Sequence, residues 1–291
     1  MWIVLAIASA LGLGFYDIFK KLSVEKNNVL IVLFLNTLFS TLLMSPVIIS
    51  CLSHGSIGLG DTYEGHLRII LKAFIVLSSW LLGYFGIKHL PLTIAGPINA
   101  ARPVIVLVGA LIIFGERLNL MQWIGVILGF WSLFFISRVG MKEGFSFKHS
   151  KWLWFSIGAT FMGAVSALYD KYLLRQYEPL EVQAWYSLYQ MIIMGVTIAI
   201  LLRDKKSRTP FHWSWAIPCI SIFLTGADIA YFYALSLPGS MIAVVSMIRR
   251  GSVIVSFFYG VMALHEKHIK LKLIDLGILL IGLTFLVLGS R

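Results

Sequence analysis

The chain has 291 residues, of which 59% are hydrophobic and 13% are charged, and its mean hydropathy is +0.88. This composition excludes a water-soluble surface, so lipid has to be the solvent. The net charge of +11 would suit a nucleic-acid partner, but Lys and Arg cluster beside apolar segments, where anionic lipid headgroups attract them. We therefore expect membrane lipids as partners and no nucleic acid.

Ten apolar runs predict ten transmembrane helices. Each crossing of the hydrocarbon core needs roughly 20 residues, so ten crossings nearly exhaust the chain and any chemistry has to lie between the helices. The first run has no charged leader and no small-residue cleavage site, so we expect it to remain in the mature protein. In chain order the runs are 2–22, 29–51, 67–88, 92–114, 121–137, 152–175, 182–202, 213–236, 240–264 and 272–289.

Matched positions recur in the two halves of the chain, far apart in sequence. They are Tyr16 and Asp17 with Tyr169 and Asp170, Leu90 and Pro91 with Leu237 and Pro238, Arg102 with Arg250, and Glu116 with Glu266. The sequence thus predicts a five-helix repeat at 1–137, a basic link at 138–151 and a second repeat at 152–291. An odd number of helices in each repeat inverts the second repeat relative to the first.

This pattern resembles the drug/metabolite transporter superfamily, specifically its ten-helix EamA-type members. The resemblance is carried by the doubled five-helix layout, the Leu-Pro links and the segment FGERLN at 114–119, whose Gly-Glu after the fourth helix is typical of these proteins. The second copy departs from it, with His265 before Glu266. The resemblance implies a central cavity lined mainly by the third, fourth, eighth and ninth helices, with access alternating between the two membrane faces.

Charged residues inside the predicted spans argue for such a cavity independently. Arg102 and Arg250 lie near the middles of their predicted helices, where an Arg costs about 2.5 to 3.5 kcal/mol on insertion scales. Arg249 and Arg250 are separated by roughly 100° around a helix, so at least one should face an aqueous space. The alternative is that these arginines simply pair with Asp17, Asp170 and Asp228 and lock the helices together.

A helix breaker follows each matched arginine, Pro103 in one half and Gly251 in the other. Discontinuous helices of this kind commonly bound transporter sites, although a kink made for packing is an alternative. Aromatic residues are dense nearby, and they could line the cavity or serve as core and lipid contacts. Trp185, Tyr186 and Tyr189 are instead predicted to be interfacial anchors.

The predicted site therefore combines midplane charges with aromatic rings. Substrate contacts are predicted at Asn99, Arg102, Arg249, Arg250, Asp228, Trp80, Tyr84 and Tyr231, and coupling or gating roles at Asp17, Asp170, Glu116 and Glu266. We expect no catalytic residue, metal or cofactor, because no nucleophile motif, metal-ligand spacing or nucleotide fingerprint is visible. Small residues such as Gly125 and Gly129 are expected to serve helix packing.

The leading functional hypothesis is a secondary transporter, an exporter or exchanger, of a small anionic or zwitterionic metabolite. Arg102 and Arg250 would attract its carboxylate or phosphate, and Asp228 would bind an amine or carry a coupling proton. One alternative is a transporter or flippase of a lipid or lipid-linked headgroup. Another, of a different class, is a membrane-embedded enzyme or a non-transporting membrane subunit.

Localisation follows from the basic links. Lys and Arg concentrate in the links after the odd-numbered helices, which the positive-inside rule places in the cytoplasm, with both chain termini outside. We expect the inner membrane of a bacterium and a monomer or homodimer.

Overall fold

The computed structural model describes residues 1–24, 27–53, 58–61, 63–89, 102–140, 151–201, 211–252, 255 and 269–289, and all regular structure within these ranges is helical. The first half contains α1 (Trp2–Val24), α2 (Val29–Ser53), the short 3₁₀ helix η1 (Leu59–Asp61), α3 (Tyr63–His89), α5 (Arg102–Ile113) and α6 (Leu120–Gly140). The second half contains α7 (Lys151–Leu173), α8 (Pro179–Leu201), α9 (Ala216–Ser236), α10 (Ile242–Arg249) and α12 (Ile269–Gly289). The predicted all-helical class is confirmed.

The largest departure from the predicted boundaries is in the ninth helix, which was expected to run from 240 to 264. Instead α10 ends at Arg249, because the N–H of Arg250 donates to Met247 O at 3.0 Å and that of Gly251 donates to Ile248 O at 2.8 Å. These tight three-residue turns interrupt the α-helical hydrogen bonding, so the predicted break in the second half is present. In the first half Pro103 lies in the first turn of α5, where its missing N–H costs little.

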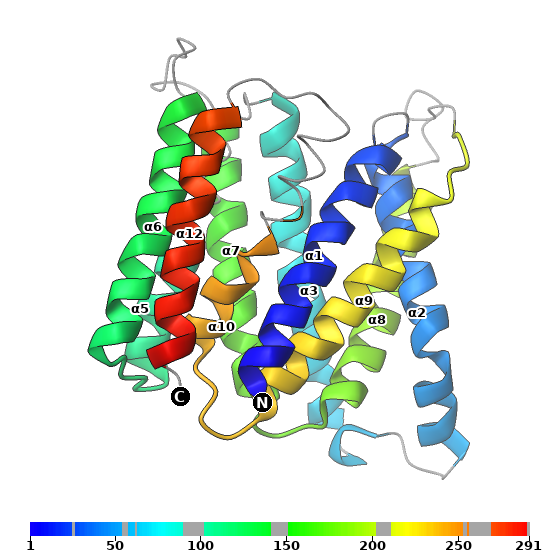
Figure 1. Ribbon diagram of the computed structural model, residues 1–291. Coiled ribbons are helices and arrows are strands. Elements are labelled where there is room, and N and C mark those ends of the chain that lie inside the picture. The colour runs from blue at the N-terminus through cyan, green and yellow to red at the C-terminus, as the bar shows by residue number, and fades with distance from the viewer. Residues whose placement is uncertain are drawn as a thin grey trace.

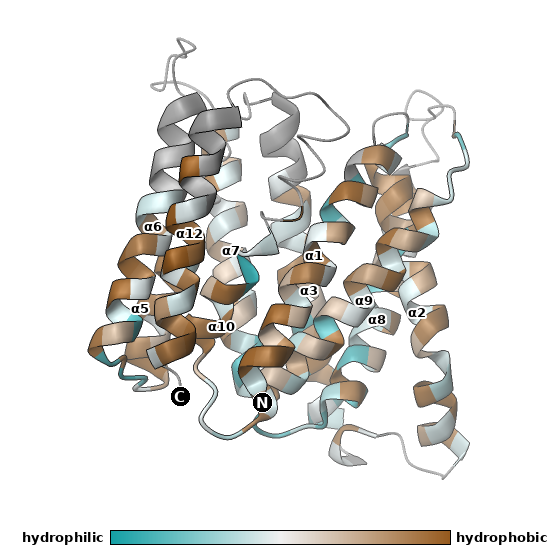
Figure 2. Cartoon of the chain, in the orientation of Figure 1, coloured by the Kyte–Doolittle hydropathy of each residue, from teal (hydrophilic) through white to brown (hydrophobic). Residues whose placement is uncertain are grey.

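The outward faces of the helices are apolar, as lipid contact requires. Five of the described helices, α1, α2, α3, α7 and α9, are long and apolar enough to cross a membrane. Large apolar side chains such as Ile112, Trp131 and Trp154 are exposed on the outside of the bundle, and hydrophobic residues recur along the labelled helices (Figure 2). A helix in water would instead carry polar side chains on its outward face.

The contacts between helices follow the two-fold relation of the repeats. α1 packs against α9, and its repeat counterpart α7 packs against α3; likewise α1 contacts α10 and α7 contacts α5. The pairs α2 with α8, α5 with α10 and α6 with α12 join each helix to its own counterpart. The two halves are therefore interleaved rather than placed side by side (Figure 1). Every major contact between them has a mate.

Glycines allow a close crossing between α6 and α12. A Cβ added to Gly125 would lie 2.7 Å from the carbonyl oxygen of Gly282, and one added to Gly282 would lie 3.2 Å from the backbone nitrogen of Gly129. Both neighbours are backbone atoms that cannot move aside. The packing role predicted for Gly125 and Gly129 therefore holds.

The two ends of the bundle differ. Both chain termini lie at one end, which also contains the starts of α3, α8 and α10 (Figure 1). We call this the terminal end. The opposite end, the link end, is reached by the C-terminus of α1 and the C-terminus of α6. α1 and α6, which precede Lys- and Arg-rich links in the sequence, both end there.

Candidate functional site

A cavity of about 430 Å³ lies between the two halves. Its walls come from α3, α5, α9 and α10, the third, fourth, eighth and ninth predicted helices, as expected from the family resemblance. They also come from α1, α7 and Tyr186 of α8, which the sequence reasoning had not assigned to the cavity. A volume of this size suits a small metabolite.

Charged side chains dominate the polar part of the cavity wall. Five are basic and three are acidic: Lys20, Lys72, Arg102, Arg249, Arg250, Asp17, Asp170 and Asp228. They come from both repeats. The described wall therefore carries an excess of positive charge, which favours an anionic ligand.

Lys72 and Asp170 form an ion pair between α3 and α7, with 2% and 8% of their side chains exposed. The ammonium also lies 4.4 Å from the ring centroids of both Tyr186 and Phe232. Such a cation–π arrangement compensates part of the desolvation of a buried amine. The prediction that Tyr186 is an interfacial anchor is wrong, because its ring is buried beside Lys72.

Sequence reasoning also missed Lys72, although a signal was present. Lys72 is a charged residue inside the third apolar run, and intramembrane charges of this kind mark functional or paired sites by default. Its partner could not be read from the sequence, because Lys72 and Asp170 are distant along the chain.

Asp228 and Arg249 form the second ion pair of the cavity. Nη2 of Arg249 donates to Oδ1 of Asp228 at 2.9 Å, and the guanidinium carbon lies 3.9 Å from the ring centroid of Tyr231. For Asp228 and Arg249, the structure therefore shows the alternative that the sequence left open, in which an arginine pairs with an aspartate. The carboxylate considered for a substrate amine is already engaged by a protein cation.

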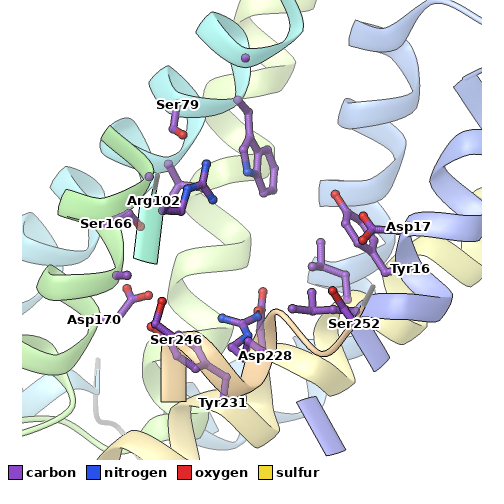
Figure 3. Close-up of a pocket in the computed structure, with 18 of the residues that line it drawn as sticks. Tyr16, Asp17, Ser79, Arg102, Ser166, Asp170, Asp228, Tyr231, Ser246 and Ser252 are labelled. Atoms are coloured by element: carbon purple, nitrogen blue, oxygen red, sulfur yellow. The ribbon is translucent and has the colours of Figure 1, made fainter. Parts of the chain in front are cut away.

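Of the four other charged side chains, Lys20 lies 5.3 Å from the ring centroid of Tyr16. Among the described residues, neither Arg102 nor Arg250 forms an ion pair, and Asp17 forms none either. The Nε of Arg102 is buried and has no hydrogen-bond partner. The guanidinium lies against Gly163 of α7, where any Cβ would collide with it. Figure 3 shows Arg102 and Asp17 on opposite sides of the cavity.

The remaining predicted contacts divide into two groups. Trp80 and Tyr231 line the cavity. Tyr84 belongs to α3, but its side chain is outside the described part of the chain, as are Asn99 and Glu266 entirely. Substrate contact stays a prediction for each of these residues.

Glu116 lies outside the cavity lining, in the connection between α5 and α6. Its Oε1 accepts the N–H of Ile242 at 2.7 Å and its Oε2 accepts that of Ala243 at 3.2 Å. A carboxylate from the first repeat therefore caps the N-terminus of α10 in the second, where the helix dipole favours negative charge. Burial raises the pKa of Glu116, while the two backbone N–H groups and the nearby Lys171 and Arg175 counteract that rise.

Further polar contacts join segments at the terminal end. Nζ of Lys171 donates to Leu235 O at 3.0 Å, to Ser240 O at 2.8 Å and to Ser240 Oγ at 2.5 Å. Glu181 accepts the N–H of Leu59 at 2.9 Å. Together with Glu116, these contacts hold the connection between α9 and α10 and tie the start of α8 to η1. Hydrogen bonds between different segments therefore connect the described residues at this end.

Comparison with known proteins agrees with this architecture. The model of the EamA-like transporter family matches residues 1–138 and again residues 150–288. A solved crystal structure aligns with a TM-score of 0.72 over 97% of this chain and 98% of its own length, and its 14% sequence identity limits the likeness to the fold. No curated protein matches the chain in sequence. Because the family model covers both repeats, the chain belongs to the EamA-like transporter family of the drug/metabolite transporter superfamily and is an integral membrane protein.

Proposed function

We propose that this transporter moves a small anionic or zwitterionic metabolite by alternating access, with Arg102 binding the anionic group in the central cavity. The observation that carries the proposal is the unpaired state of Arg102. Its Nε is buried without a hydrogen-bond partner and, within the described part of the chain, no carboxylate pairs with it, whereas Lys72 and Arg249 each form an ion pair with a cavity aspartate. A buried, unpaired cation is costly unless a ligand supplies the missing acceptor.

Arg250 supports the same ligand chemistry. It is the repeat counterpart of Arg102, lines the same cavity and has no ion-pair partner among the described residues. Two guanidinium groups in one cavity repel each other unless an anion lies between them. Guanidinium forks suit carboxylate and phosphate oxygens particularly well.

Alternating access is supported by the arrangement of the repeats. The major contacts between helices of the two halves have mates, so the halves can exchange conformations around a site held between them. In the present arrangement Glu116 and Lys171 join segments at the terminal end, outside the cavity lining. These are a few hydrogen bonds, which a rocking motion can break and re-form.

The direction of transport is inferred from the distribution of Lys and Arg between the two ends of the bundle. α1 and α6 end at the link end and are followed in the sequence by basic links, so the positive-inside rule assigns this end to the cytoplasm. Because contacts join the segments at the terminal end, we infer that the cavity in this state is reached from the cytoplasmic side. An exporter or exchanger loads its substrate from that side. We expect the inner membrane of a bacterium as its location.

Transport in proteoliposomes tests the proposal. A thermal-shift screen of the purified protein with carboxylates, amino acids and sugar phosphates identifies a stabilising compound, whose radiolabelled form is then used for uptake. Arg102→Gln should weaken its binding by about tenfold or more, because a hydrogen bond to a charged group is lost. Arg117→Gln, at an exposed arginine outside the cavity lining, is the control. Unchanged uptake by Arg102→Gln would reject the anion site.

A further inference from the structure

The repeat-related carboxylates Asp17 and Asp170 are in opposite states, although both line the cavity. Asp170 is bound to Lys72 and only 6% of it is exposed. Asp17 is exposed toward the cavity and makes no hydrogen bond or ion pair with any residue that the structure describes. One copy of the repeated carboxylate is therefore neutralised by the protein and the other is available.

Lys72 accounts for this difference, and the repeat explains why the difference persists through a transport cycle. At the spacing that aligns Leu90 with Leu237, Lys72 corresponds to Cys219 of α9. When the repeats exchange conformations, α9 takes the place relative to α1 that α3 now has relative to α7. Cys219 carries no cation, so the exchange does not supply Asp17 with the partner that Asp170 has.

The other acid of the cavity is also occupied. Asp228 accepts a hydrogen bond from Arg249 at 2.9 Å, and that guanidinium is stacked on Tyr231. Lys20 and Arg250 attract Asp17 electrostatically but form no ion pair with it. Among the described residues, Asp17 is thus the one acid of the cavity wall that is free to accept a new cation.

Asp17 and Arg102 lie on opposite sides of the cavity, on α1 and α5 (Figure 3). An unpaired carboxylate facing an unpaired guanidinium complements a ligand that carries one charge of each sign. Each pole of such a ligand would satisfy one group that the protein leaves unsatisfied. A purely anionic ligand would satisfy Arg102 but would bring no cation to Asp17, whose carboxylate would keep only the electrostatic attraction of Lys20 and Arg250.

We propose that Asp17 binds the cationic group of a zwitterionic substrate whose anionic group faces Arg102; this inference rests on the proposed function. The cavity then discriminates a zwitterion from an anion of the same size, and Asp17 is the residue that determines the discrimination. Asp170 and Asp228 do not share this role, because each holds a protein cation.

Matched ligand pairs test the inference with the full-length protein in detergent. The pairs are L-leucine with 4-methylpentanoate, β-alanine with propionate, and taurine with ethanesulfonate, each measured by calorimetry and thermal shift. The wild type should bind the zwitterion of at least one pair about tenfold more tightly than its anion. Asp17→Asn should remove that preference and leave binding of the anion equal or tighter. Glu178→Gln, at an exposed carboxylate outside the cavity lining, should bind as the wild type does.

Several results would overturn the inference. One is that the wild type prefers no zwitterion of the set, and another is that Asp17→Asn keeps the wild-type preference. A third is that Asp17→Asn leaves both affinities unchanged but abolishes uptake driven by a pH gradient, since the carboxylate would then carry a proton. Arg102→Gln separates this inference from the proposed function: it should weaken both members of a pair, whereas Asp17→Asn weakens only the zwitterion.

Discussion

Lys72 of α3 forms an ion pair with Asp170 of α7 and thereby joins the two repeats in the wall of the cavity. The pair is nearly inaccessible to solvent, and two aromatic rings cover the ammonium. It keeps one cation and one carboxylate of the cavity out of reach of a ligand. The binding properties of the cavity therefore depend on the charges that are left.

Removing one member of this pair should destabilise the protein strongly. Lys72→Met leaves Asp170 as a buried, unpaired charge, which typically costs about 3 to 5 kcal/mol. We expect a clear fall in the thermal unfolding temperature in detergent. The double variant Lys72→Met with Asp170→Leu should recover most of the loss, because no charge is then left unpaired. Equal unfolding temperatures for the single and double variants would show that the pair is not coupled.

Gly163 and Gly125 should respond differently to the same substitution. In Gly163→Ala the new methyl group meets the far end of Arg102, a flexible side chain that can move. Ligand affinity should fall by about tenfold while the unfolding temperature changes little. In Gly125→Ala the methyl group meets the backbone oxygen of Gly282 at 2.7 Å, so the unfolding temperature should fall and affinity should change less. Calorimetry and thermal unfolding of both variants check this contrast.

Loss of the Glu116 cap should open the terminal end. Glu116→Ala leaves the N–H groups of Ile242 and Ala243 without their acceptor, and a lost helix cap costs about 1 kcal/mol, or roughly fivefold in a population. In a variant without Cys51 and Cys219, a cysteine introduced by Ser246→Cys reports access to the cavity. A membrane-impermeant thiol reagent applied from the terminal side should label it about fivefold faster in Glu116→Ala. Unchanged labelling would mean that Glu116 does not restrain α10.

The pH dependence of the same labelling follows from the pKa of Glu116. We call the state in which Glu116 caps α10 the joined state, and the state in which its carboxylate is in water the released state. Burial raises the pKa of Glu116 in the joined state, whereas release into water would return it toward 4.5. The joined state therefore binds a proton more tightly than the released state, so protonation favours it. As the pH falls from neutral through the raised pKa, labelling from the terminal side should slow, and this extra stabilisation should be lost again as the pH rises. Glu116→Gln should remove the pH dependence.

Much of the architecture was predictable from the sequence because it depends on local composition and on the repeat. Apolar runs of membrane-spanning length are helical wherever the structure describes them, and the break after Arg249 follows from Gly251. The presence of Arg102, Arg250 and Asp17 in a shared cavity was also anticipated from charges inside apolar runs. A charge that costs energy in lipid has to face the protein interior, whatever the packing is.

The tertiary structure alone decided which charged side chains pair with one another. The sequence offered three acids and three arginines, and it did not indicate that Lys72 neutralises Asp170 or that Asp228 is taken by Arg249. Nor did it show Glu116 as a cap on the helix of the other repeat. These contacts join residues far apart in the chain, and a hydrogen bond depends on distances of a few tenths of an ångström that only packing determines. Sequence by itself therefore determined that charges lie inside the membrane, and the fold decided that Arg102, Arg250 and Asp17 are the ones left for a ligand.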